Sequence, residues 1–117
     1  MLPVQHAVST PAAIEEEVAA LTLDACGMIL DCSQPAERLL GYLRGELVRR
    51  HVSLLVPHFE NNAMILDGQI NPRTRYLCHC GHLFEVLDSQ GRSFMSEIHL
   101  FEPQNQDRRI VKLILCQ

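Results

Sequence analysis

Apolar and polar residues alternate in several parts of the chain, and a period of two is typical of a strand with one buried face. Leu21, Leu23 and Ala25 share one face of such a strand, while Thr22 and Asp24 share the other. This alternation, or a run rich in Val, Ile and Leu, predicts five strands. They cover residues 21–25, 28–32, 76–87, 93–102 and 109–116.

Tight turns are expected at two of the connections. Gly27 ends the first turn, where glycine can take a positive φ at little cost. The sequence Asp-Ser-Gln-Gly at 88–91 predicts a hairpin turn with glycine at its end. In the strand 93–102 that follows, one face mixes polar and apolar residues, so we expect it to be half exposed or to form an interface. That face carries Met95, Glu97, His99 and Phe101.

A helical period of 3.6 is clearest just after the second strand. Ala36, Leu39, Leu40 and Leu43 lie at i, i+3, i+4 and i+7, which places them on one helical face. Ser33 precedes this stripe and is a favoured N-cap residue. The pattern therefore predicts a short capped helix whose apolar stripe packs on the sheet.

The N-terminal part predicts a second amphipathic helix, over residues 11–20. Thr10 offers an N-cap, and a proline follows it at the first helical position. Ile14, Val18 and Leu21 lie at i, i+4 and i+7. A helix this short is unstable alone in water, so its apolar stripe must pack on its own domain or on a partner chain.

The segment 58–74 has the weakest pattern. Turn signals occur at Asn61, at the Asp-Gly pair 67–68 and at the Asn-Pro pair 71–72. Residues 63–66 allow about one helical turn, so we expect a short helix inside a long loop. Loops of this length in small domains are often functional.

The order of these elements is helix, two strands, short helices, loop and three strands. It predicts an α+β domain built on one antiparallel sheet of five strands. At 117 residues the chain fits a single domain. We divide it into a leader with the N-terminal helix, residues 1–20, and the sheet-containing domain, residues 21–117.

Composition narrows the partners and the compartment. The net charge is -4 and the pI about 5.8, which disfavours nucleic-acid binding because that needs a clustered basic face. No apolar run reaches the roughly 20 residues of a membrane span, and the N-terminus does not resemble a secretory signal. Five cysteines, an odd number, favour reduced thiols in a cytoplasmic protein.

The sequence Cys-His-Cys-Gly-His at 78–82 is the most unusual local feature. On a strand, Cys78, Cys80 and His82 would point the same way, and thiolate and imidazole are ligands for zinc or another soft metal. However, structural zinc sites usually have C-x₂₋₄-C spacing and a second ligand pair, and neither is evident. The alternatives are two small buried thiols with exposed imidazoles, or a redox-responsive thiol pair. Alternate strand residues lie near the long limit of disulfide reach.

Catalysis is not expected of this chain. Carboxylates occur at Asp24, Asp31, Glu85 and Glu97. No recognised motif joins any of them to a histidine or serine in the way that a nucleophile or an acid–base pair requires. The sequence therefore favours a binding or signalling module over an enzyme.

Five short motifs, in this order, resemble those of the PAS domain family of sensory modules. Residues 27–29 resemble the family's G-x-I turn, 36–42 its A-x-x-x-L-G-Y helix and 46–47 the E-L that follows. Residues 52–57 resemble the segment before the family's central F helix. Residues 90–94 resemble the D-G-x-x-F of its G–H hairpin, with glutamine in place of the usual aspartate.

The resemblance implies a five-stranded antiparallel sheet with short helices on one face. It also implies a non-catalytic role in sensing or dimerisation. Such modules bind a small ligand and relay a signal to an output domain, such as a histidine kinase or a cyclic-dinucleotide enzyme, in the same chain or in a partner. A helix before the first strand often makes the dimer contact, so Ile14, Val18 and Leu21 are the expected interface of a homodimer.

The alternative implied by the resemblance is a metal- or haem-binding redox or gas sensor. Segment 52–57 is nearest to the oxygen-sensing haem PAS domains, in which a histidine on the F helix binds the iron. The comparable place here is near Met64, and the nearest histidine is His58. These two residues are the candidate cofactor ligands, but the departure at the ligand position disfavours haem. The flavin-binding motif of the family's light sensors is absent from the sequence.

Overall fold

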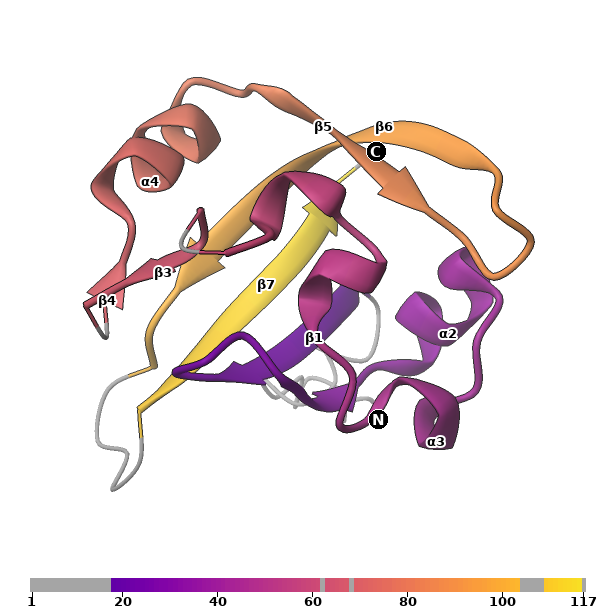
Figure 1. Cartoon of the computed structure of the whole chain (residues 1–117). Coiled ribbons are helices and arrows are strands. Elements are labelled where there is room, and N and C mark those ends of the chain that lie inside the picture. Colours follow the sequence, from indigo (N-terminus) through magenta and orange to yellow (C-terminus); the bar gives the residue numbers. More distant parts are fainter. Residues whose placement is uncertain (1–17, 62, 68, 104–108, 117) are drawn as a thin grey trace, which may run out of the picture.

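A five-stranded antiparallel sheet forms one layer of the molecule, and short helices cover one of its faces (Figure 1). The computed structural model describes residues 18–61, 63–67, 69–103 and 109–116. The sheet confirms the predicted α+β domain with five antiparallel strands, and its strand order is β2-β1-β7-β6-β5. The strands are β1 (Ala19–Asp24), β2 (Ile29–Cys32), β5 (Leu83–Leu87), β6 (Ser93–Phe101) and β7 (Ile110–Cys116).

The segment between β2 and β5 supplies the helical layer. It also contains a small two-stranded hairpin that is separate from the main sheet. Among the described residues, no helix is long and apolar enough to cross a membrane. These elements are α2 (Gln34–Leu40), α3 (Arg44–Leu47), the 3₁₀ turns η1 (Val52–Leu54) and η2 (Pro57–Phe59), β3 (Ile65–Leu66), β4 (Gln69–Ile70) and α4 (Pro72–His79).

The expected turn between the first two strands is confirmed. Gly27 has a φ of +87°, a conformation that glycine adopts without a steric cost. The Asp24 carboxylate accepts hydrogen bonds from the backbone N–H groups of Cys26 (2.8 Å) and Met28 (3.0 Å). One side chain therefore satisfies two turn donors and aligns β2 against β1.

Helix α2 begins and ends where the sequence signals lie. The Ser33 hydroxyl accepts a hydrogen bond from the backbone N–H of Ala36 (3.3 Å), and Gly41 closes the helix in the left-handed conformation. Ala36 and Leu40 are buried against the sheet. The expectation that Leu43 continues this stripe is wrong. The helix ends at Leu40, and the Leu43 side chain is 69% exposed.

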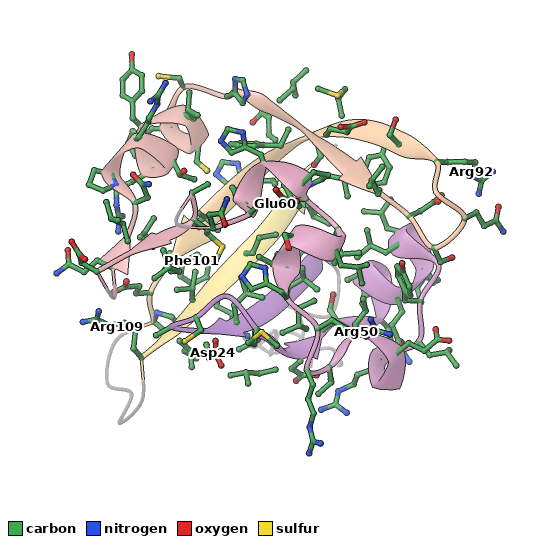
Figure 2. The ribbon with its side chains drawn as sticks, viewed as in Figure 1. Asp24, Arg50, Glu60, Arg92, Phe101 and Arg109 are labelled. Atoms are coloured by element: carbon green, nitrogen blue, oxygen red, sulfur yellow. The ribbon has the colours of Figure 1, made fainter. Side chains whose placement is uncertain are left out.

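The helix-facing side of the sheet forms the core. On β7, Val111, Leu113 and Leu115 are buried and alternate with less buried residues, as a half-buried strand requires. The other face is polar in part. On this side Met95 is 54% exposed and Phe101, at the end of β6 (Figure 2), is 44% exposed. The mixed face of this strand is thus half exposed, one of the two outcomes expected.

The expectation of a strand beginning at residue 76 is wrong, because residues 72–79 form helix α4. Asn71 is its N-cap and accepts a hydrogen bond from the backbone N–H of Arg73 (3.0 Å), with a proline at the first helical position. Thr74 and Cys78 are the buried residues of the helix. Their i, i+4 spacing is a helical stripe of two residues, too short to stand out among alternating polar residues.

The helical turn expected at residues 63–66 is also wrong. Ile65 and Leu66 form strand β3, which pairs with β4 in antiparallel fashion. Asp67, in the connection, has a φ of +54°, and an Asp-Gly pair is a strong signal for a two-residue hairpin loop. The expected N-terminal helix lies largely outside the described residues, but its last residues, Ala19 and Ala20, belong to β1.

Candidate functional site

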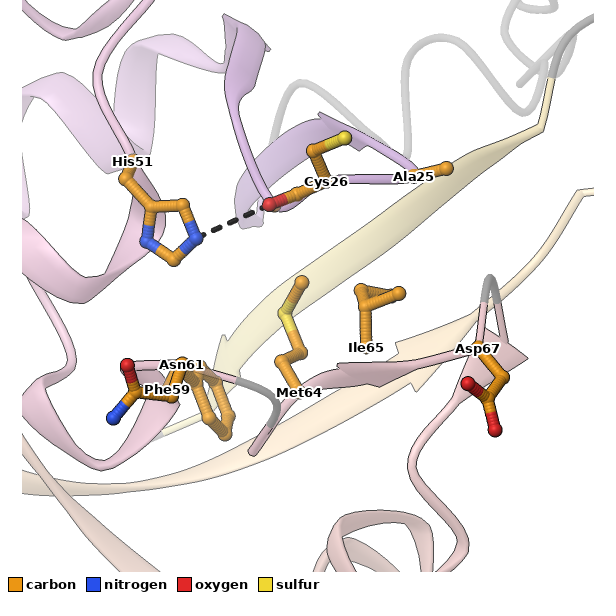
Figure 3. Close-up of a pocket in the computed structure, with 9 residues that line it drawn as sticks. Ala25, Cys26, His51, Phe59, Asn61, Met64, Ile65 and Asp67 are labelled. Atoms are coloured by element: carbon orange, nitrogen blue, oxygen red, sulfur yellow. Dashed lines mark hydrogen bonds between the residues drawn. The ribbon is translucent and has the colours of Figure 1, made fainter.

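A cavity of about 280 Å³ opens beside the turn between β1 and β2 (Figure 3). The turn forms one wall, and the chain from η2 to the β3–β4 hairpin forms the opposite wall. His51, just before η1, lies between them. The lining residues are Ala25, Cys26, Gly27, His51, Phe59, Asn61, Met64, Ile65 and Asp67.

His51 is fixed by hydrogen bonds at both ring nitrogens. Nδ1 accepts from the backbone N–H of Ser53 (3.1 Å), so it carries no proton in this arrangement. Nε2 lies 3.1 Å from the carbonyl oxygen of Cys26 and therefore donates. The neutral Nε2–H tautomer satisfies both contacts. The ring thus caps η1 at one end. At the other end it holds the β1–β2 turn through the Cys26 carbonyl (Figure 3).

The backbone around His51 runs alongside β2. The N–H of Ile29 donates to the carbonyl of Arg50 (2.8 Å), and the N–H of Arg49 donates back to the carbonyl of Ile29 (2.8 Å). The N–H of Val52 donates to the carbonyl of Gly27 (2.9 Å). A Cβ at Gly27 would lie 2.8 Å from His51 Nε2. Glycine is therefore required here both for its φ and for the close approach of the imidazole.

The inner end of the cavity is apolar and part of the core. Phe59 and Met64 line it, and both side chains are fully buried. The Met64 carbonyl accepts from the N–H of Asn71 (2.7 Å), and the Thr74 hydroxyl donates to the carbonyl of Ala63. These two hydrogen bonds connect helix α4 and its N-cap to the segment that leads into the β3–β4 hairpin.

The mouth of the cavity is polar. Asp67, Asn61 and Cys26 are exposed there, and the side chain of Asp67 forms no ion pair with another described residue. A buried apolar end with a few polar groups at the rim is the usual form of a small-molecule site. This arrangement suits a small ligand with a hydrogen-bond donor that can meet the Asp67 carboxylate.

The three residues expected to share a face as metal ligands do not do so. Cys78 and Cys80 belong to α4 and its C-cap, and His82 follows in the connection to β5. Cys78 is buried whereas Cys80 and His82 are exposed. The shared face was predicted for a strand, whereas residues 72–79 form a helix. Among the described residues, no group of three His, Cys, Asp or Glu side chains is placed to hold a metal ion.

The thiols differ in their readiness to ionise. Burial raises the pKa of Cys78 to about 11, and burial together with the nearby Glu37 carboxylate raises the pKa of Cys32 to about 11. Since the thiolate is the reactive form, these two residues act as small apolar side chains. All five cysteines are free, and Cys26 and Cys80 are exposed.

The two candidate cofactor ligands, Met64 and His58, differ in how deeply they are buried. Met64 lies in the core at the inner end of the cavity. His58 is exposed on η2 and contacts the rings of Phe59 and Phe84. The exposed His58 also borders a second hollow of about 420 Å³ between η2 and the start of α4.

The expected dimer residues fall in three different settings. Leu21 is 1% exposed and lies within β1, so the expectation that it belongs to a helical interface stripe is wrong. Val18 precedes β1 and is half-buried, and its carbonyl accepts a hydrogen bond from the Ser33 hydroxyl (2.7 Å). Ile14 lies outside the described residues.

Two of the candidate carboxylates have structural partners. Asp24 orders the β1–β2 turn, and Asp31 accepts from Arg44 Nε at 2.5 Å. Burial opposes ionisation of Asp31, but the hydrogen bonds from Arg44 and the Cys32 N–H outweigh it and lower the pKa of Asp31. Glu97, on the exposed sheet face, has an oxygen 3.9 Å from His99 Nε2. None of these three carboxylates lines the cavity.

The sequence did not indicate His51, Phe59 or Asp67 as cavity residues. The His51 ring reaches the carbonyl of Cys26 across 25 positions of the chain. The spacing of neighbouring residues in the sequence does not indicate a contact between residues so far apart in the chain. The only sequence signal for a site in this region was the length of the segment 58–74, since loops of this length are often functional.

Comparisons with known proteins connect this architecture to one fold. No family model matches the sequence, and no curated protein matches it. A solved PAS domain of a two-component sensor histidine kinase is 16% identical, with a TM-score of 0.62 over 84% of this chain and 82% of that one. The PAS domain of nitrogen regulation protein NR(II) from Vibrio parahaemolyticus is 20% identical, with a TM-score of 0.64 over 93% and 98%.

A third similar structure is the PAS domain of an HTR-like protein from Haloarcula marismortui. It is 20% identical, with a TM-score of 0.66 over 88% of this chain and 84% of that one. The strand order, the helices on one face and these likenesses define one class of domain. The chain has the PAS fold, as the sequence motifs had indicated.

Proposed function

We propose that this chain is a sensory module that binds a small molecule in the cavity beside His51 and relays the binding event to an output domain. The cavity carries the proposal. It has a buried apolar end at Phe59 and Met64 and a polar mouth at Asp67, the usual character of a ligand site. Likeness to PAS domains, one of them from a sensor histidine kinase, supports a role in signalling.

The walls of the cavity suit such a relay. One wall belongs to the sheet turn and the other to the β3–β4 hairpin, which is not part of the main sheet. A ligand that contacts both walls favours whichever conformation holds them at the right spacing. The output domain is proposed to be a histidine kinase or a cyclic-dinucleotide enzyme, in the same chain or in a partner.

A thermal-shift screen of metabolites tests ligand binding. A ligand at 100 times its Kd stabilises the folded state by about 2.7 kcal/mol. This raises the melting temperature by a readily measured amount. Ile65→Trp fills the cavity from β3 and should abolish the shift. Leu66→Trp is the matched control, because Leu66 is the next residue on the strand, is exposed and does not line the cavity. Equal shifts in both variants would place the ligand elsewhere.

We also propose that two copies associate through the exposed sheet face and the N-terminal segment. The face carries Met95 and Phe101, which are unusually exposed for their size. The sequence stripe of Ile14 and Val18 precedes β1, a strand inside the same sheet. Together these apolar residues suit a second copy of the chain.

Light scattering after size exclusion tests the dimer. Val18→Asp and Met95→Asp should each shift the protein toward monomer. Leu43→Asp is the control, since Leu43 is highly exposed but lies at the start of α3, away from the sheet face. A wild-type monomer at high concentration, or an equal effect of the control, would overturn the dimer.

No reaction is proposed for this chain, because its placed carboxylates serve the turn, the Arg44 pair and the exposed sheet face. A cytoplasmic location is proposed as well. It is supported by five cysteines that are all free in the structure, since thiols persist in reducing compartments. Haem is not proposed, because Met64 is enclosed in the core.

A further inference from the structure

Two histidines lie next to each other at one edge of the sheet. His58 belongs to η2, and His82 lies just before β5, an element that packs on η2. Their ring centroids are 6.4 Å apart, and the planes of the rings are inclined by 48°. Both residues are exposed, so the space between the rings is open to solvent.

Both imidazoles rest on the same buried ring. The centroid of Phe84 lies 5.3 Å from that of His58 and 4.8 Å from that of His82, with the rings nearly perpendicular in both pairs. His58 also contacts Phe59 in a T-shaped arrangement at 5.9 Å. Phe84 and Phe59 are buried. These contacts keep the two imidazoles next to each other before any ligand arrives, so that only a limited side-chain rotation is needed for binding.

Neither imidazole has a polar partner within the part of the chain that the structure describes. Among the described residues, no hydrogen bond or ion pair involves a ring nitrogen of His58 or His82. His51, in contrast, uses both of its ring nitrogens inside the protein. The nitrogens of the exposed pair are therefore available to a ligand from solution.

We infer that His58 and His82 together bind one divalent transition-metal ion of the Ni²⁺ or Zn²⁺ class. Such an ion sits about 2.0–2.1 Å from each imidazole nitrogen, so the centroids of two coordinated rings lie roughly 4.5–5 Å apart at adjacent coordination positions and at most roughly 6.5 Å apart at opposite positions. The observed separation of 6.4 Å lies at the upper end of this range. Rotation of the exposed side chains closes the remainder, and water fills the other coordination positions.

The bound ion joins two elements that are distant in the sequence. It links η2, which carries Phe59 of the cavity wall, to β5 of the main sheet. The site itself lies outside the cavity and does not depend on the ligand proposed above. It also differs from the sequence-based Cys/His cluster, since it contains neither Cys78 nor Cys80.

Titration calorimetry with NiCl₂ tests the site. Ni²⁺ is the better probe because imidazole suits it, whereas Zn²⁺ also binds thiolates well. The wild-type protein should bind one ion. His58→Gln and His82→Gln should each weaken binding by about tenfold or more, equivalent to ~1.4 kcal/mol. His79→Gln is the control, an exposed histidine on α4 that should leave the affinity unchanged.

Circular dichroism and metal-free melting temperatures establish that the variants are folded. Both histidines are exposed, so we expect only small shifts without metal. The inference is overturned if the wild-type protein binds no Ni²⁺. It is equally overturned if only one of the two substitutions weakens binding, or if His79→Gln weakens it to the same extent.

Discussion

The close approach of Gly27 and His51 can be tested by its effect on the stability of the protein. Gly27→Ala adds a Cβ that would lie 2.8 Å from His51 Nε2. The imidazole must then move, which breaks its hydrogen bond to the Cys26 carbonyl. The substitution therefore has two separable costs, one from the backbone and one from the displaced ring.

The magnitudes follow from these two costs. At a φ of +87°, a residue with a Cβ costs about 1–2 kcal/mol. Loss of the His51 hydrogen bond adds about 1 kcal/mol. We therefore expect Gly27→Ala to lower the free energy of unfolding by about 2–3 kcal/mol in the wild-type background.

A double-mutant cycle separates the two costs. In a His51→Ala background the ring is absent, so Gly27→Ala should cost only the backbone term of about 1–2 kcal/mol. The coupling energy between the two positions should thus be about 1 kcal/mol, within the range for residues in contact. Urea unfolding followed by circular dichroism measures it, since the chain has no tryptophan. Additive effects would refute the proposed contact between Gly27 and His51.

Three further predictions concern the rest of the fold. Ser33→Ala loses the helix cap and the hydrogen bond to the carbonyl before β1, so urea unfolding should show a loss of about 2 kcal/mol. Because the pKa of Asp31 is depressed in the folded state, its carboxylate stabilises the protein at pH values above the pKa of the unfolded chain, about 3.9. This contribution to the free energy of unfolding is lost as the pH falls. Asp31→Asn should therefore flatten the acid limb of a pH-stability curve. Iodoacetamide at pH 8 should alkylate Cys26 well before Cys32 and Cys78, whose pKa values are about 11, as peptide mass spectrometry can establish. Equal alkylation rates, an unchanged acid limb or a neutral Ser33→Ala would each contradict its prediction.

The sheet could be predicted from the sequence because its signals are local. Ser33 marked the start of α2, and Gly27 marked the first turn. Alternation along β6 and the apolar run of β7 marked two of its central strands. Each of these signals lies within a few residues of the element that it specifies, so the sequence of one chain was enough.

The segment between η2 and β5 could not be predicted in the same way. The Asn-Pro pair at 71–72 was interpreted as a turn, whereas it caps α4. The turn signal at 67–68 suited a hairpin, but β3 and β4 have only two residues each, too few to show alternation. Tertiary packing on the hairpin and sheet, through Thr74 and Cys78, decides this region.

The candidate site was least visible for the same reason. His51 reaches the β1–β2 turn through space, and His58 meets His82 only because η2 packs on β5. The sequence named His58 as a candidate cofactor ligand beside Met64, and His82 as a candidate metal ligand beside Cys78 and Cys80, but it did not pair the two histidines. The contact between them depends on the fold of the whole chain.

A methyl spectrum of methionine-labelled protein tests the central claim most directly, namely that a small molecule occupies the cavity. The chain has four methionines. Met64 lines the cavity, and Met95 lies on the exposed sheet face. We predict that a compound found by thermal shift moves the Met64 methyl resonance and leaves the Met95 resonance in place. A compound that moves Met95 while Met64 stays unchanged would contradict the cavity as the ligand site.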